Sequence, residues 1–315
     1  MSDQLKEKLQ GCVYSVFTPY DKNEALDFEA LERYLTHLYR TGARKFYVMA
    51  YNSRYAQLSN DEIFELNAFV TRTVKGLDPE NIAIVGDPIH CTTKVSTEFA
   101  RHAKEIGADL ISLLVQEKYY SDNQMLDHFA EVGRESGMAL LIHEMVFMSG
   151  FDGSQMHWPR SLFAGLPKIP QIMALKEDAK VFETTCAALE LEPRIRVIIS
   201  GRKSALMQYR DHGAKAYLNG VSILDARIGE MFWQAFENKD HKTTDFILEK
   251  LEAPFFDVAP AKYGWHRVNK ALLQAAGLMH RRDRMPLNHL SDEEYKLIEE
   301  IYPPIESAIA ELVGK

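Results

Sequence analysis

Short apolar runs rich in Val, Ile and Leu recur along the first two-thirds of the chain, and stretches with helical spacing separate them. Eight runs begin at residues 13, 45, 82, 109, 138, 171, 196 and 216. Each interval has room for one helix and two short loops. Continuous apolar strands separated by helices are typical of a parallel sheet whose outer face is covered. Eight such units in sequence predict an α/β fold, a (β/α)8 TIM barrel.

Start and stop signals frame the helices between these runs. Ser59 with Glu62, and Ser291 with Glu294, have the spacing of capping boxes, in which a hydroxyl and a carboxylate satisfy the first amides of a helix. Glycines near the ends of four intervals suit the left-handed conformation that often terminates a helix. These glycines are Gly42, Gly107, Gly137 and Gly213.

The strand-like runs stop after about residue 225, and helical spacing continues near 228–251, 262–277 and 291–313. We therefore predict a barrel core over residues 1–225, closed by a helix to about residue 251, and a C-terminal helical region over 252–315. Five prolines are expected to punctuate this region. They are Pro254, Pro260, Pro286, Pro303 and Pro304.

Composition and charge exclude several classes of protein. The 315 residues include 37 Lys and Arg against 45 Asp and Glu, a formal net charge of −8, which argues against coating nucleic acid or an anionic membrane. A hydrophobic fraction of 46% can furnish a sizeable core. No apolar run is long enough to predict a transmembrane span. Three widely spaced cysteines, Cys12, Cys91 and Cys186, indicate reduced thiols in a cytoplasmic protein and predict no metal centre.

Lys176 stands out among the residues that end the predicted strands, where barrel enzymes carry their reactive groups. It follows four apolar residues, 172–175, so its amine is expected to begin inside the barrel mouth. A desolvated lysine loses its proton more easily, and the neutral amine can attack a carbonyl to form a Schiff base. The alternative is a solvated lysine that opens a polar loop, its charge offset by Glu177 and Asp178.

Several short motifs lie in the same order as in a known enzyme family. They are Thr18-Pro19-Tyr20, the segment AYNSRYAQLSNDE from Ala50, Gly107-Ala108-Asp109, Leu175-Lys176-Glu177, Ser200-Gly201, and a tail with Lys270-Ala271-Leu272, Gly277 and Arg284-Met285-Pro286-Leu287. With them the chain resembles, nearly end to end, the dihydrodipicolinate synthase and N-acetylneuraminate lyase family of class I aldolases. The resemblance implies that Lys176 is the lysine that forms the Schiff base.

The chain departs from the family where a relay of hydroxyl groups is expected. Tyr51 and Asn52 replace the T-T pair that holds a 2-oxo acid carboxylate, and Ser53 follows. Tyr51 is then either a proton relay or a wall of the pocket. The family's P-Y-Y motif falls on residues 116–118, whose letters are Gln-Glu-Lys. Either a small insertion restores the proton-shuttle tyrosine as Tyr119 or Tyr120, or the shuttle is lost and Glu117 or Tyr51 replaces it.

A second departure follows the fifth run. The family's Y-N-x-P-x-R segment begins here with His143 and Glu144, and its substrate-steering arginine is absent. A histidine beside a carboxylate is either tuned for acid-base work or a buried structural pair. We take Lys176, Tyr51 and Tyr119 as catalytic candidates. The substrate-binding candidates are Asn52, Ser53, His143, Glu144, Arg202 and Leu218.

These observations predict a Schiff-base lyase or aldolase that makes or breaks a carbon–carbon bond of a 2-oxo acid, either pyruvate-type or sugar-derived. Two alternatives stay open: a dehydratase of a 3-deoxy-2-oxo sugar acid that uses the same iminium, and a binding protein that keeps the carbonyl pocket without turnover. The chemistry needs no metal and no organic cofactor. The resemblance also implies a homotetramer or homodimer whose partner is a small molecule, not nucleic acid or membrane.

Overall fold

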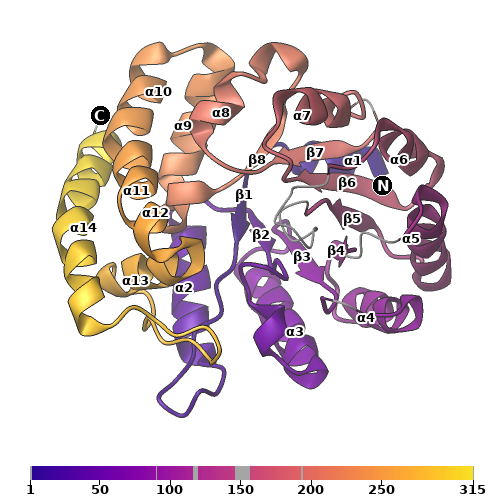
Figure 1. Cartoon of the computed structure of the whole chain (residues 1–315), viewed down its shortest axis with the longest axis horizontal. Coiled ribbons are helices and arrows are strands. Elements are labelled where there is room, and N and C mark those ends of the chain that lie inside the picture. The colour runs from indigo at the N-terminus through magenta and orange to yellow at the C-terminus, as the bar shows by residue number, and fades with distance from the viewer. Residues whose placement is uncertain (1, 90, 116–119, 146–156, 193, 315) are drawn as a thin grey trace.

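The fold is a closed barrel of eight parallel strands (Figure 1), as the apolar runs predict. The computed structural model describes residues 2–89, 91–115, 120–145, 157–192 and 194–314. Each strand pairs with the next along the chain, and the last pairs with the first. The strands are β1 (Gly11–Ser15), β2 (Lys45–Tyr47), β3 (Ile82–Gly86), β4 (Leu110–Leu114), β5 (Leu140–His143), β6 (Ile172–Glu177), β7 (Arg196–Ile199) and β8 (Ala216–Leu218).

Helices surround the barrel and connect its strands (Figure 1). Both predicted capping boxes are present, and all four predicted glycines adopt a positive φ. The α-helices up to the last strand are α1 (Ser2–Lys8), α2 (Phe28–Arg40), α3 (Asn60–Leu77), α4 (Thr93–Glu105), α5 (Asp122–Ser136), α6 (Arg160–Gly165), α7 (Phe182–Leu189) and α8 (Lys203–Met207). Short 3-10 turns are η1 (Tyr55–Gln57), η3 (Leu166–Lys168), η4 (Arg210–His212) and η5 (Gly220–Ile223).

Inward-facing side chains fill the barrel and close one of its ends. Val13 and Tyr47 belong to a buried cluster inside the barrel. Leu9, which follows α1, extends this cluster toward the N-terminal ends of the strands. Arg196 Nε of β7 donates a hydrogen bond to the Lys6 carbonyl at 3.2 Å, which ties α1 to the strands. The N-terminal opening is therefore covered. The opening at the C-terminal ends of the strands is the one where barrel enzymes bind their substrates.

The segment 228–251, predicted as one helix, forms two helices instead. Helix α9 (Ala226–Asn238) ends where Lys239 adopts the left-handed conformation at φ 56°. Asp240 then caps α10 (His241–Ile247), its side chain accepting a hydrogen bond from the Thr243 amide at 3.2 Å. The chain continues through a π-helical turn, η6 (Leu248–Glu252). The capping carboxylate stabilises a new helix start, so the chain turns rather than extends.

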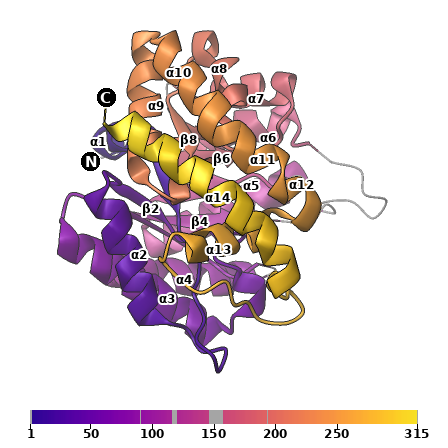
Figure 2. The same ribbon diagram turned by 90° about the vertical axis from the view of Figure 1, so that its left-hand side faces the viewer.

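The C-terminal region consists of α11 (Ala253–Asp257), α12 (Ala259–Tyr263), α13 (Trp265–Ala275) and α14 (Asp292–Val313). Figure 2 shows α14 crossing the side of the molecule that faces the viewer, between α11 and α13. The expectation that prolines punctuate this region fails at Pro303 and Pro304, which lie inside α14. The prolines cannot bond to the carbonyls of residues 299 and 300, but that face of the helix is exposed and water can serve those carbonyls. None of the helices in the described ranges combines the length and the apolar character needed to cross a membrane.

Candidate active site

Strand β6 places Lys176 inside the mouth of the barrel. Successive side chains of a strand alternate between its two faces, so Lys176 shares the inner face with Ala174, which belongs to the interior cluster. In register, Lys176 lies opposite His143 of β5 and Ile198 of β7. Its side chain is only 2% exposed. Burial lowers the pKa of the Lys176 amine below its ordinary value of 10.5, although Asp178 acts in the opposite direction.

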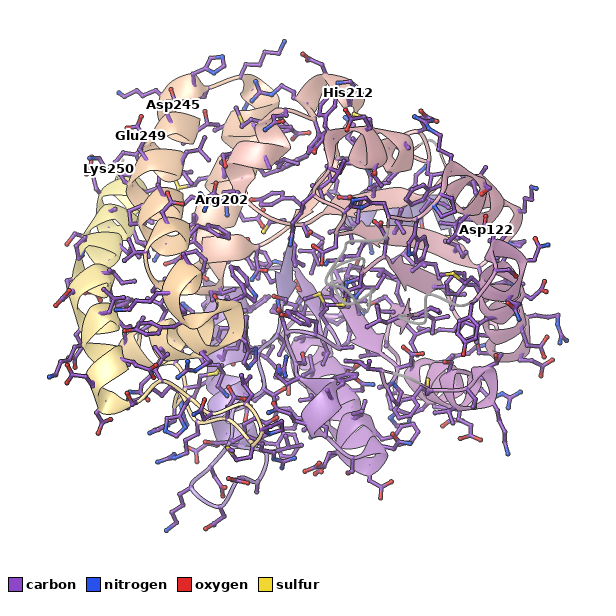
Figure 3. All side chains as sticks on the ribbon, in the orientation of Figure 1. Asp122, Arg202, His212, Asp245, Glu249 and Lys250 are labelled. Carbon is purple, nitrogen blue, oxygen red and sulfur yellow. The ribbon has the colours of Figure 1, made fainter. Side chains whose placement is uncertain are left out.

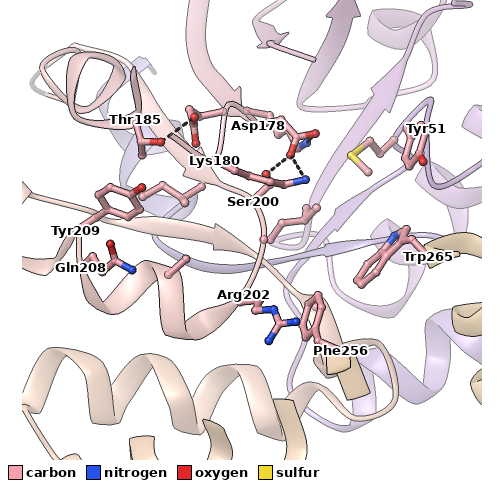
Figure 4. A pocket seen from close by; sticks show the side chains of 18 of the residues that line it. Tyr51, Asp178, Lys180, Thr185, Ser200, Arg202, Gln208, Tyr209, Phe256 and Trp265 are labelled. Carbon is pink, nitrogen blue, oxygen red and sulfur yellow. Dashed lines mark hydrogen bonds and ion pairs between the residues drawn. The ribbon is translucent and has the colours of Figure 1, made fainter. Parts of the chain in front are cut away.

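Asp178 lies two residues further along and forms the ionic partner of this amine. The distance between Lys176 Nζ and Asp178 Oδ2 is 2.8 Å. The other carboxylate oxygen, Oδ1, accepts a hydrogen bond from Ser200 Oγ and lies 3.3 Å from Lys180 Nζ (Figure 4). Burial alone would raise the pKa of Asp178, but the two ammonium groups and these hydrogen bonds outweigh it and lower the pKa. Lys176 and Asp178 are therefore a buried, anchored ion pair.

A cavity of about 750 Å³ opens over this ion pair. It extends from Tyr51 and Trp265 on one side to Gln208 and Tyr209 on the other (Figure 4). Its walls are mainly apolar and aromatic, and its polar groups gather around the end of β6. The wall residues include Met49, Phe182, Ile199, Leu218 and Phe256, and the polar residues include Lys176, Asp178, Lys180, Ser200 and Arg202.

The structure brings Lys176, Tyr51, Asn52, Arg202 and Leu218 together around one cavity. The Asn52 side chain is already bonded within the protein. Its amide nitrogen donates to Ser15 Oγ at 2.8 Å, and its oxygen accepts a hydrogen bond from Trp265 Nε1 at 3.1 Å. Asn52 thereby fixes the indole of Trp265 as a wall of the cavity.

Ser53 lies behind the cavity wall and is fully buried. Its hydroxyl donates to the Val16 carbonyl at 2.6 Å, and its amide donates to the Met49 carbonyl at 2.7 Å. The Ser53 carbonyl accepts a hydrogen bond from Thr18 Oγ1 at 2.8 Å. These bonds join the loops after β1 and β2 and give the second loop a fixed shape.

Arg202 stands at the outer edge of the cavity and is 43% exposed along its side chain. Its guanidinium lies 2.5 Å from Asp257 and packs over the ring of Phe256 at 4.9 Å. Figure 3 shows Arg202 toward the middle of the molecule, whereas Glu249 and Lys250 lie at the outer rim. Arg202 therefore places a guanidinium at the entrance, where Asp257 offsets its charge.

His143 and Glu144 are buried side by side at the end of β5. Neither ring nitrogen of His143 hydrogen-bonds to a described residue, and burial lowers the pKa of this histidine well below 6.5. Glu144 Oε2 accepts a hydrogen bond from the Asp178 amide at 3.4 Å. Burial, reinforced by the charge of Glu177, raises the pKa of Glu144 to about 8. His143 is thus a neutral imidazole and Glu144 a carboxyl group that is largely protonated at neutral pH, and no hydrogen bond joins the two side chains.

Tyr119 lies outside the described residues, as does Glu117, one of the residues proposed to replace it. The residues that sequence reasoning missed are Asp178, Lys180 and Trp265. A signal for Asp178 was present: a residue two positions after Lys176 shares its face if the strand conformation continues. Trp265 gives no such signal, because its contact with Asn52 spans 213 positions of sequence.

The part of the chain that the structure describes contains no group of three or more His, Cys, Asp or Glu side chains placed to hold a metal ion. Cys12, Cys91 and Cys186 lie apart as free thiols. The polar groups at the cavity floor are an amine, a carboxylate and a hydroxyl. This set can attack a carbonyl carbon and move protons beside it.

Comparison with known proteins agrees with this geometry. A model of the dihydrodipicolinate synthetase family matches residues 8–303. A 4-hydroxy-tetrahydrodipicolinate synthase of Staphylococcus carnosus is 27% identical over 303 residues, covering 93% of this chain and 96% of the relative. The enzyme of that name from Archaeoglobus fulgidus is 20% identical, covering 94% and 98%.

Solved structures show the same fold. The dihydrodipicolinate synthase of Bacillus clausii superposes with a TM-score of 0.82 at 18% identity, covering 96% of this chain and 99% of its own. CdNal of Clostridium difficile, solved in complex with mannosamine, gives a TM-score of 0.80 at 17% identity, with coverages of 94% and 98%. Because the family model spans nearly the whole chain, this protein belongs to the dihydrodipicolinate synthetase family, a family of class I aldolases and lyases.

Proposed function

We propose that this protein is a Schiff-base lyase or aldolase that acts on a 2-oxo acid in the cytoplasm. The observation that carries the proposal is the buried amine of Lys176 at the floor of the 750 Å³ cavity. A buried amine with a lowered pKa loses its proton more easily, and the neutral amine is the nucleophile that attack on a ketone requires. Membership of a class I aldolase family supports the same role.

The proposed reaction proceeds through an iminium on Lys176. The amine bonds to the ketone carbon of the 2-oxo acid, and the carbonyl oxygen leaves as water. The positively charged iminium then accepts the electron pair of the bond between the adjacent carbon and the next one. That bond breaks as the hydroxyl on the more distant carbon gives its proton to a base, which releases an aldehyde and leaves an enamine. Synthesis is the reverse, in which the enamine attacks an aldehyde. The aromatic walls of the cavity would hold the remainder of the substrate.

The substrate carboxylate is proposed to bind near Lys180 and Arg202, which carry positive charge at the cavity rim. On the opposite side, Asn52 and Ser53 already use their side chains in bonds within the protein. The carboxylate site of this chain would therefore lie toward β6 and β7. A guanidinium that can exchange Asp257 for a ligand is suited to that task.

Borohydride trapping tests the proposal. Incubation with pyruvate, or with longer 2-oxo acids, followed by reduction, is expected to leave one stable adduct on Lys176, located by peptide mass spectrometry. An adduct on another lysine would contradict the assigned nucleophile. If a broad set of 2-oxo acids and aldehydes gave no adduct, the binding-protein alternative would be favoured. Release of water without an aldehyde from a 3-deoxy-2-oxo sugar acid would identify the dehydratase instead.

We also propose a role for Tyr51 once the iminium has formed. Its hydroxyl group accepts the proton that leaves a substrate carbon, or donates the proton that a substrate carbon gains. If so, Tyr51→Phe should lower turnover about a hundredfold or more with a modest change in substrate affinity. Borohydride labelling of Lys176 should continue at the wild-type rate, because the iminium still forms. Unchanged turnover in steady-state assays would show that Tyr51 is only a wall of the cavity.

We also propose that the chain works as a homotetramer or a homodimer, as the family resemblance implies. Closed symmetric assemblies are the usual form of soluble oligomers. Light scattering at micromolar concentration should then give a mass at least twice the 36.0 kDa of one chain. A mass of one chain across the concentration range would contradict this expectation.

A further inference from the structure

The contacts of Asp178 go beyond what an ion pair needs for stability. Its two carboxylate oxygens are used differently. Oδ1 is anchored by Ser200 Oγ from the end of β7 and by Lys180 Nζ, while Oδ2 faces Lys176 Nζ at 2.8 Å. The Asp178 side chain is only 5% exposed. Its backbone amide donates a hydrogen bond to Glu144 Oε2. The backbone at Asp178 is therefore held in place, in addition to the carboxylate.

We propose that Asp178 is the catalytic acid-base residue of imine formation, carrying protons from the Lys176 nitrogen to the substrate's carbonyl oxygen. The inference rests on the proposed function, because it assigns a residue to the first step of that reaction. Asp178 qualifies as catalytic because its Oδ2 contacts the reacting nitrogen directly. A carboxylate within hydrogen-bond distance of the proton it moves meets the geometric requirement for general acid-base catalysis.

The protons of the ion pair balance the step without an outside donor. Asp178 first takes a proton from the Lys176 ammonium group and leaves a neutral amine. The amine lone pair bonds to the ketone carbon, the π electrons move to oxygen, and that oxygen takes the proton from Asp178. The nitrogen is now positively charged, and Asp178 removes a second proton from it.

The second proton completes the elimination of water. Asp178 gives it to the carbinolamine hydroxyl, the carbon–oxygen bond breaks, and water leaves. The nitrogen lone pair forms the double bond of the iminium, which keeps one proton. A ketone and an ammonium group have become an iminium and water, and Asp178 is again a carboxylate, now paired with the iminium. Oδ2 of Asp178 carries the proton in each transfer. The contacts with Ser200 and Lys180 that hold the side chain in place use only Oδ1.

The rate of imine formation in Asp178→Asn separates two roles for Asp178. A role that depends only on its charge predicts the opposite result from a role as proton carrier. Without its negative charge, the buried Lys176 would hold its proton less tightly and would be neutral more often. Asp178→Asn would then form the imine as fast as the wild type or faster. Loss of a proton carrier should instead slow imine formation about a hundredfold or more.

The test measures imine formation by itself, with pyruvate and 2-oxobutanoate as probes. Two readouts apply to the full-length protein: the rate of borohydride labelling at Lys176, and the exchange of the probe's carbonyl oxygen with ¹⁸O-labelled water. Asp178→Asn is expected to slow both about a hundredfold. Asp178→Ala should be equally slow and should regain at least tenfold when formate is added, because the removed carboxylate leaves space for a small acid. Asp225→Asn, which removes a buried ion-paired carboxylate at the start of α9, is the matched control and should keep wild-type rates.

The outcomes separate this inference from the proposed function. If the wild type labels Lys176 and Asp178→Asn labels it as fast, Asp178 carries no proton and the inference is overturned. Slow Asp178→Ala that formate does not accelerate would assign Asp178 a structural role and also overturn it, with circular dichroism confirming that the variant is folded. If the wild type shows neither labelling nor exchange with these probes, nor an adduct with the broader set of 2-oxo acids and aldehydes, the imine itself is wrong and the proposed function fails.

Discussion

Lys176→Arg is expected to lower turnover by at least about a thousandfold and to abolish the borohydride adduct. Arginine keeps the positive charge that the buried Asp178 needs, so the protein should remain folded. A guanidinium does not lose its proton at neutral pH and therefore cannot attack a ketone. The assay follows consumption of a panel of 2-oxo acids and 3-deoxy-2-oxo sugar acids. Lys250→Arg, on the exposed rim of the molecule, is the control and should keep wild-type turnover.

Lys176→Met separates the nucleophile from the charge. It should abolish the adduct as well, and it should also lower the free energy of unfolding by about 3 kcal/mol, because Asp178 would be buried without its closest partner. The nearby Lys180 limits the loss. Adding Asp178→Asn to this variant should recover part of the stability but none of the activity. Turnover that survived in Lys176→Arg would mean that another amine forms the imine or that no imine forms.

The barrel was predictable because each strand needs only local information. Apolar side chains face both the barrel interior and the helices, so a strand reads as an unbroken apolar run, and the runs at 45 and 82 begin at the first residues of β2 and β3. Lys176 was predictable for the same reason, since it ends such a run. The break at Lys239 was not: without a Gly or Pro, the helical spacing continues across it, and only the capping pair of Asp240 and Thr243 marks the new start.

The surroundings of Lys176 were harder to predict because they depend on contacts between distant segments. The sequence Lys-Glu-Asp is compatible with a solvated loop, and burial of Asp178 becomes evident only once Ser200, which follows the next strand, reaches its carboxylate. Asn52 is a candidate for binding a substrate carboxylate, yet its amide nitrogen already donates to Ser15 Oγ, and Trp265, in the C-terminal region, donates to its oxygen. The position of Lys176 inside the barrel mouth therefore follows from local pattern, while the groups that contact its amine follow from the closing of the barrel.

Glu144→Gln is expected to stabilise the protein in a pH-dependent way. Burial raises the pKa of Glu144 to about 8 in the folded state, against an ordinary value of 4.5. Below about pH 4.5 both states hold the proton, so the group has no effect. Between pH 4.5 and 8 the unfolded state releases the proton while the folded state keeps it, so the stability of the wild type falls as pH rises; above pH 8 the loss levels off.

Glutamine cannot release a proton, and its side-chain oxygen can still accept the hydrogen bond from the Asp178 amide. Glu144→Gln should therefore match the wild type near pH 4.5 and exceed its free energy of unfolding by on the order of 4 kcal/mol at pH 8. Urea unfolding at pH 4.5, 6, 7 and 8 measures the difference. Glu249→Gln, at an exposed position, should shift stability equally at every pH. A difference for Glu144→Gln that is also constant with pH would show that Glu144 is ionised in the folded protein at neutral pH, and hence that the end of β5 is less shielded from water than its burial indicates.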